Sequence, residues 1–276
     1  MTSRLAPLFD ACRAERRAAL VGYLPAGYPS VARSMELLGA MVDAGCDLVE
    51  VGVPYSDPVM DGPTIQAAAD AALRAGMRLR DVFSVVESVA GAGGRAVVMT
   101  YWNPVHRYGV DAFARDLAAA GGLGMITPDL LPDEAEDWLG AADAHDLDRI
   151  FLVAPSSTRR RLAVTAAATR GFLYAASTMG ITGARDVVSS AAPELVRRAR
   201  AQAADLPVGV GLGVRNGAQA AEVAAFADAV IVGSAFVTCA AEGDAAVRAL
   251  AADLAAGVRR PAHDQPDTGG GIPWGA

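Results

Sequence analysis

The chain has 276 residues, of which 53% are hydrophobic and 20% are charged, and its formal net charge is −7. This composition is typical of a compact globular protein, and the acidic balance argues against a nucleic-acid footprint or a basic membrane patch. No apolar run approaches the roughly 20 residues of a membrane helix, and the segment from Met1 to Leu8 has no apolar core of secretory length. We therefore expect a cytoplasmic protein.

The first predicted element is an amphipathic helix, because Leu5, Leu8, Phe9 and Cys12 recur at helical spacing. We expect this helix to cover the bottom of the structure that follows it. Short, near-continuous apolar runs then alternate with alanine-rich helical stretches, as is typical of parallel strands buried on both faces. Eight such strands are predicted, at Ala19–Leu24, Leu48–Val53, Ala96–Tyr101, Met125–Thr127, Ile150–Val153, Phe172–Ala176, Val208–Leu212 and Ala229–Val232.

Alternating strands and helices leave two architectures, a doubly wound parallel sheet or a closed barrel. Eight repeats favour the α/β class in its (β/α)8 TIM barrel form, with an extra N-terminal helix, over residues 1–258 as one domain. Right-handed crossovers then bring the carboxyl ends of all strands to one face, where barrel enzymes carry their chemistry. Two long connections on that face, 54–63 and 177–190, are predicted lids or binding loops. Residues 259–276 are rich in Pro, Gly and polar residues, and we expect a flexible tail.

Lysine is absent, since all 24 basic residues are arginine. An amine that forms an imine with a carbonyl substrate or with pyridoxal phosphate is therefore excluded, as is a Walker-type phosphate lysine. The three cysteines and three histidines are scattered, which argues against a disulfide framework or a metal site. We expect chemistry that uses carboxylates, hydroxyls and backbone dipoles, with no metal and no cofactor in this chain.

A phosphate site is predicted at the carboxyl ends of the seventh and eighth strands. Gly211, Leu212 and Gly213 follow the seventh strand, and Gly233 and Ser234 follow the eighth. Glycines let backbone N–H groups approach an anion, and the start of a helix adds its dipole. The alternative is a pair of tight turns without a ligand, but these two positions are the common phosphate site of barrels. A single anion cluster favours a sugar monophosphate over a dinucleotide.

A candidate acid/base lies in the second strand, where Glu50 interrupts an apolar run. A carboxylate there must face a functional cavity or find a partner, and burial would raise its pKa toward neutrality. The alternative is a structural glutamate paired with an arginine. Asp57 and Asp61 lie in the following loop, and either one, taken by itself, is explained as a turn former. Tyr174, taken by itself, is explained as a core residue.

The wider motifs resemble those of the alpha subunit of tryptophan synthase. The longest is the unbroken run from Glu50 to Gln66, EVGVPYSDPVMDGPTIQ. In collinear order, from about residue 18 to about residue 240, it is joined by residues 22–29, 99–104, 128–130, 150–155, 174, 180–183 and 233–234.

This resemblance implies roles for individual residues. It implies that Glu50 and Asp61 are catalytic and that Tyr174 lies beside the substrate. It implies phosphate contacts from Gly183, Gly213, Gly233 and Ser234, a lid contact from Thr182, and a role for Asp57 in communication with a beta subunit. Position alone suggests Tyr23, Met99 and Leu212 as walls of an indole pocket.

The implied reaction is retro-aldol cleavage of indole-3-glycerol phosphate to indole and glyceraldehyde 3-phosphate, a lyase step of tryptophan biosynthesis. The implied partner is the pyridoxal phosphate-containing beta subunit, in an alpha2-beta2 complex. Three alternatives stay open here: another phosphosugar barrel enzyme, a stand-alone indole-releasing lyase, and a non-catalytic barrel that binds a phosphate ligand and regulates a partner. The chain departs from the family pattern at Tyr28, and at Thr178 and Met179 in the predicted lid.

Overall fold

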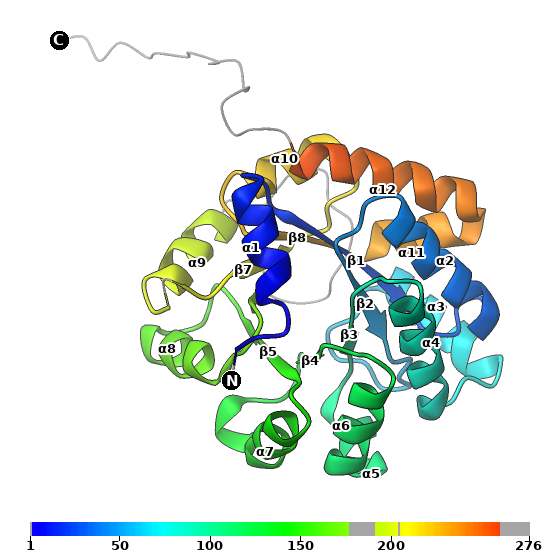
Figure 1. The fold of residues 1–276 in the computed structure, drawn as a ribbon, viewed down its shortest axis with the longest axis horizontal. Coiled ribbons are helices and arrows are strands. Elements are labelled where there is room, and N and C mark those ends of the chain that lie inside the picture. The colour runs from blue at the N-terminus through cyan, green and yellow to red at the C-terminus, as the bar shows by residue number, and fades with distance from the viewer. Residues whose placement is uncertain (1, 177–190, 204, 260–276) are drawn as a thin grey trace, which may run out of the picture.

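The computed structural model describes residues 2–176, 191–203 and 205–259. Its eight strands form a closed parallel barrel in the order β1 to β8 (Figure 1). This confirms the predicted fold class, and each strand lies within two residues of its predicted range. The strands are β1 Ala19–Pro25, β2 Leu48–Gly52, β3 Ala96–Met99, β4 Gly124–Thr127, β5 Asp148–Val153, β6 Leu173–Ala176, β7 Val208–Gly211 and β8 Ala229–Val232.

Helices surround the barrel (Figure 1). Side chains that accept a backbone N–H fix where several begin: Ser30 caps α2, Thr158 caps α8 and Asn216 caps α10. The elements outside the barrel are α1 Ala6–Ala14, α2 Val31–Asp43, α3 Pro63–Arg74, α4 Leu79–Gly91, α5 Trp102–Tyr108, α6 Val110–Ala119, the 3-10 turn η1 Pro132–Glu134, α7 Glu136–Ala144, α8 Arg159–Ala168, α9 Ala191–Arg200, α10 Gly217–Ala224, α11 Ser234–Glu242 and α12 Asp244–Val258.

Helix α1 covers one end of the barrel, as predicted (Figure 1). Leu5, Leu8, Phe9 and Cys12 are all buried there. They join one apolar cluster with residues of the barrel strands and of the position just before β6, namely Ala19, Val21, Leu48, Val97, Ile126, Ile150, Phe172, Ala229 and Ile231. Helix α1 therefore packs against the interior of the barrel at this end.

A buried carboxylate anchors the segment before α1. Asp148, at the start of β5, is fully buried and accepts hydrogen bonds from the Ser3 hydroxyl at 2.7 Å and from the Leu5 backbone N–H at 2.9 Å. The Arg170 guanidinium donates to the same carboxylate at 3.0 Å. These charge-assisted hydrogen bonds satisfy a carboxylate that is buried away from water. They hold the segment before α1 against the start of β5.

We expect Asp148→Ala to lower the free energy of unfolding by about 3 kcal/mol, because it leaves Arg170 and two backbone N–H groups short of a buried partner. Asp143→Ala is the matched control. Asp143 contacts the same Arg170, but its side chain is 54% exposed, so its loss should cost less than about 1 kcal/mol. Urea unfolding of both variants measures the difference, and equal losses would contradict the anchoring role.

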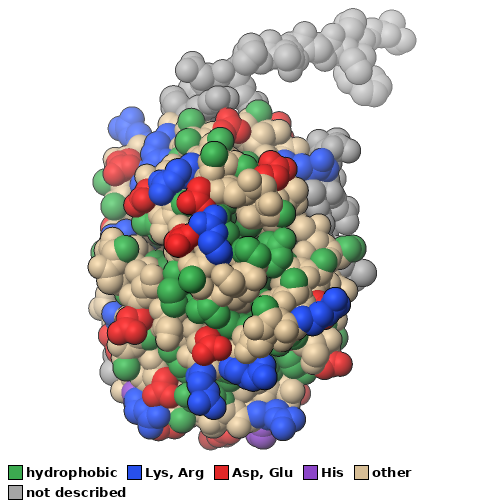
Figure 2. Space-filling view, turned by 90° about the vertical axis from the view of Figure 1, so that its right-hand side faces the viewer, with side chains coloured by type: hydrophobic (Ala, Val, Ile, Leu, Met, Phe, Trp, Pro, Cys, Tyr) green, Lys and Arg blue, Asp and Glu red, His purple; other side chains and the backbone are tan. Residues whose placement is uncertain are grey.

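The outer surface is mixed in character. On the face drawn in Figure 2, acidic and basic side chains are interspersed around a central group of apolar ones. In the described part of the chain, no helix is long and apolar enough to cross a membrane. The predicted tail begins where α12 ends, and its residues 260–276 lie outside the described ranges, as does the predicted lid at 177–190. The single-domain boundary therefore stays a prediction.

Candidate active site

A cavity opens at the carboxyl ends of the barrel strands. Residues from β1, β2, β3, β5, β6, β7 and β8 line it, together with the loops after β2, β7 and β8 and the first turns of α3 and α11. The lining residues are Tyr23, Glu50, Met60, Asp61, Ile65, Met99, Leu152, Tyr174, Ala176, Gly211, Leu212, Gly213, Ile231, Gly233 and Ser234.

The predicted catalytic, phosphate-binding and indole-pocket residues that the structure describes all line this one cavity, and Asp57 does not. Thr182 and Gly183 lie outside the described residues. Five further lining residues, all apolar, were not predicted from the sequence: Met60, Ile65, Leu152, Ala176 and Ile231. Leu152, Ala176 and Ile231 are placed by the barrel register, and Met60 and Ile65 by the fold of the segment after β2. Leu152, for example, is the Cα partner of Tyr174, and an apolar residue within an apolar strand carries no signal of its own.

Glu50 lies deep in this cavity. Its place in β2 pairs it with Tyr23 on β1 and Val97 on β3. The residue is 1% exposed, and its Oε1 has no hydrogen-bond partner among the described residues. Burial raises the pKa of Glu50 from 4.5 to about 8, because an ionised carboxylate loses its hydration there. Glu50 forms no ion pair with an arginine in the described part of the chain, so the structural alternative is not supported there.

Asp61 enters the cavity from the loop between β2 and α3. Burial raises the pKa of Asp61, and a hydrogen bond with the Tyr101 hydroxyl opposes that rise. The same hydroxyl accepts a hydrogen bond from the Met60 backbone N–H at 3.1 Å. The Tyr101 ring packs on the Tyr55 ring, with ring centroids 5.2 Å apart. Tyr101 therefore holds the loop that presents Asp61. Tyr101 lies in the motif at 99–104, and the sequence alone gave no sign of this role.

Two tyrosines flank the carboxylates, and each lies over a glycine of the next strand. A Cβ on Gly52 would overlap the Tyr23 hydroxyl, and a Cβ on Gly211 would lie 2.6 Å from the Tyr174 hydroxyl oxygen. Both tyrosine pKa values are raised well above 10, chiefly by burial and further by the nearby carboxylates. Both hydroxyls are therefore neutral donors at physiological pH.

Glycines form the opposite end of the cavity. Gly213 follows β7 with φ +70°, a conformation that favours glycine. Gly233 precedes α11, whose first residue is the buried Ser234. The α11 N-terminus directs backbone N–H groups and a positive dipole end toward this region. No arginine is among the lining residues that the structure describes. This end thus has the chemistry of an anion site built from backbone.

Comparison with known proteins gives a consistent result. A family model described as "Tryptophan synthase alpha chain" matches residues 9–263. The tryptophan synthase alpha chain of Mycobacterium tuberculosis is 68% identical over 257 residues, covering 93% of this chain and 95% of that protein. The corresponding protein of Nocardia farcinica is 70% identical over 257 residues, covering 93% and 96%.

Solved structures agree with the sequence matches. A structure of Mycobacterium tuberculosis tryptophan synthase superposes with a TM-score of 0.91 at 67% identity, covering 94% of this chain and 100% of the compared chain. The tryptophan synthase alpha chain of Legionella pneumophila gives a TM-score of 0.84 at 29% identity, covering 94% and 98%. The matches span both the barrel and the residues around its cavity. The chain belongs to the tryptophan synthase alpha chain family.

Proposed function

We propose that this chain cleaves indole-3-glycerol phosphate to indole and glyceraldehyde 3-phosphate, as a carbon–carbon lyase of tryptophan biosynthesis, with Glu50 as its acid and base. The observation that supports the roles most strongly is that two carboxyl groups line one cavity. Glu50 is buried without a hydrogen-bond partner for Oε1 among the described residues, and Asp61 bonds the Tyr101 hydroxyl. Because the chain has no lysine, it cannot form an imine with the substrate. The two carboxyl groups carry the acid and base chemistry instead.

The two ends of the cavity orient the substrate. The phosphate binds at the backbone of Gly211, Gly213, Gly233 and Ser234, and the indole ring packs among apolar residues that include Met60, Met99, Leu152 and Leu212. Thr182 and Gly183, outside the described residues, belong to the same proposal as lid and phosphate contacts. Fixing both ends holds the bond to be broken beside Glu50.

The reaction needs one proton in and one proton out. Protonated Glu50 delivers a proton to C3 of the indole, which places positive charge on the ring nitrogen. Asp61 accepts a hydrogen bond from the indole N–H and stabilises that charge. Glu50, now ionised, takes the proton of the adjacent glycerol hydroxyl. The carbonyl forms, the carbon–carbon bond breaks, and its electron pair restores the neutral indole ring.

The partner in this proposal is a tryptophan synthase beta subunit, which carries the pyridoxal phosphate, in an alpha2-beta2 assembly. Similarity to chains from solved tryptophan synthase structures supports it. The exposed apolar side chains support it as well, because Val59 and Leu131 are the large hydrophobic residues that stay exposed in the described ranges, at 72% and 45%. Both follow barrel strands on the face of the cavity. The cytoplasmic location stays a prediction from the sequence.

Indole release from indole-3-glycerol phosphate tests the proposal, with the purified chain alone and with a beta subunit added. Slow release alone with strong acceleration by the partner supports both the chemistry and the assembly. Fast release that the partner does not change would contradict the subunit role. No release under either condition, from a folded chain that binds the substrate, would contradict the enzymatic function.

We expect Gly233→Ala to weaken inorganic phosphate and indole-3-glycerol phosphate binding about tenfold, with a smaller change in kcat. A Cβ at Gly233 meets only ordinary contacts, 3.6 Å from Tyr23 and 3.7 Å from Ile65, so the added methyl enters the cavity without disturbing the fold. Gly39→Ala, where the added atom meets nothing within 4 Å, is the control. Calorimetric titration with phosphate measures the effect, and unchanged affinity would remove Gly233 from the anion site.

A further inference from the structure

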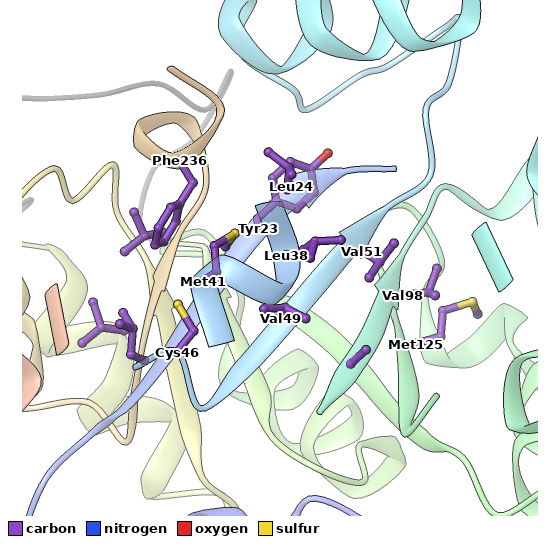
Figure 3. Packing of buried hydrophobic residues seen from close by; sticks show 14 of the residues in the cluster. Tyr23, Leu24, Leu38, Met41, Cys46, Val49, Val51, Val98, Met125 and Phe236 are labelled. Carbon is purple, nitrogen blue, oxygen red and sulfur yellow. The ribbon is translucent and has the colours of Figure 1, made fainter. Parts of the chain in front are cut away.

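The Tyr23 side chain extends across the cavity between its two ends. Its ring begins close to Gly233, since a Cβ built on that glycine lies 3.6 Å from Tyr23 Cδ1. The ring ends at Gly52, where the absence of a side chain gives the hydroxyl its room. The residue is 8% exposed, and Figure 3 shows it at the edge of the packed cluster that contains Met41 and Val49.

The Tyr23 hydroxyl faces charged groups without bonding to them. Asp61 and Glu50 are near enough to affect its ionisation, as are Tyr101 and Tyr174 to a smaller extent. In the described part of the chain, no hydrogen bond is formed by this hydroxyl, although the Tyr101 hydroxyl bonds both Met60 and Asp61. A ligand in the cavity excludes water from this hydroxyl, so a ligand that supplies a hydrogen-bond partner is favoured over a ligand that does not.

The position of the hydroxyl identifies the part of the ligand that can reach it. The base of the ring lies near Gly233 in the proposed phosphate site, and the hydroxyl lies near Glu50, which in the proposed reaction takes the proton of the glycerol hydroxyl next to the indole ring. In the substrate proposed above, the segment between phosphate and indole is a glycerol chain with two hydroxyl groups. We propose that the Tyr23 hydroxyl is a specificity-determining contact that donates a hydrogen bond to a hydroxyl of this chain. The inference rests on the proposed function.

A hydrogen-bonding site of this kind discriminates strongly against an analogue that lacks the matching group, because the protein hydroxyl is then left unpaired. Tyr23 would therefore favour ligands with a polyhydroxylated linker over equally long apolar ones. A residue that only shaped the indole pocket would affect both kinds of ligand alike, since both carry the same ring. This difference separates a hydroxyl contact from a packing role.

Tyr23→Phe tests the contact with two ligands. The first is indole-3-glycerol phosphate, followed by kcat and KM. The second is indole-3-propanol phosphate, which has the same ring and phosphate but no hydroxyl on the linker, followed by its inhibition constant. We expect kcat/KM for the glycerol substrate to fall about 10- to 100-fold. The inhibition constant for the propanol analogue should stay within about twofold of wild type or improve.

Tyr108→Phe is the matched control. It removes a hydroxyl that bonds Asp116 outside the cavity, and it should change neither ligand. Equal losses for both ligands in Tyr23→Phe would overturn the proposal in favour of packing, and no loss for either would show that the hydroxyl meets no ligand group. These outcomes differ from failure of the proposed function itself, in which the wild-type chain would release no indole.

Discussion

Replacing Glu50 with glutamine is expected to lower kcat by about 10³-fold or more while substrate still binds, because the amide can neither deliver nor accept the proton. The residue lies 1% exposed among the strands, and glutamine has nearly the same shape. Single-turnover indole release measures the chemical step, and equilibrium binding measures affinity. Glu194→Gln, on the exposed side of α9, is the surface control. Retained turnover in Glu50→Gln would end the acid/base assignment.

The same substitution should change how stability depends on pH. The pKa of Glu50 is about 8 in the folded chain against 4.5 as the ordinary value, so the folded state holds this proton more tightly than the unfolded state. The carboxyl group therefore favours folding at low pH, and that contribution is lost as pH rises from about 4.5 to about 8. Between about pH 5.5 and pH 8 the loss is about 3 kcal/mol. Urea unfolding at both pH values should show this loss in wild type and not in Glu50→Gln.

Replacing Asp61 with asparagine should lower kcat about 10²- to 10³-fold, because the variant cannot neutralise the charge that develops on the indole nitrogen. The variant keeps a side chain that can bond the Tyr101 hydroxyl, so the loop position should be retained. The loss should fall on kcat more than on KM, since the charge exists only after protonation of the ring. Steady-state kinetics measure this division.

Asp57→Asn is the matched control for Asp61→Asn. Asp57 belongs to the same loop but does not line the cavity, and its carboxylate bonds the neighbouring Ser56. Measured on the isolated chain, without a beta subunit, it should turn over at the wild-type rate. Equal losses in the two variants would show that loop charge matters rather than a carboxylate at the reacting ring.

Residue types and their positions along the chain were enough to predict the barrel and much of the site. The β-rich apolar runs alternate with helical stretches so regularly that the eight strands lie within two residues of their predicted ranges. Glu50 could be singled out because a charge in a buried run needs a reason, and Gly211, Gly213 and Gly233 because they follow the two strands where barrels bind phosphate. These signals depend on residue type and position along the chain.

Features that depend on contacts between distant segments could not be predicted in this way. Asp148 joins β5 to residues 3–5 and to Arg170, and an aspartate at a strand start gives no indication of those partners. Tyr101 acts through Met60 and Asp61 on a separate loop. The room for the Tyr23 hydroxyl depends on the close approach of Gly52, which only the packed structure reveals.

The protonation state of Glu50 at neutral pH decides whether this residue can act as the acid of the reaction. Infrared difference spectra of wild type against Glu50→Gln, recorded between about pH 5 and pH 10, isolate the carboxyl stretch of this one residue. The structure predicts a protonated carboxylic acid at neutral pH that titrates near 8. A carboxylate already ionised at neutral pH, titrating near its ordinary value, would contradict the account, because Glu50 would then hold no proton to deliver to the indole ring.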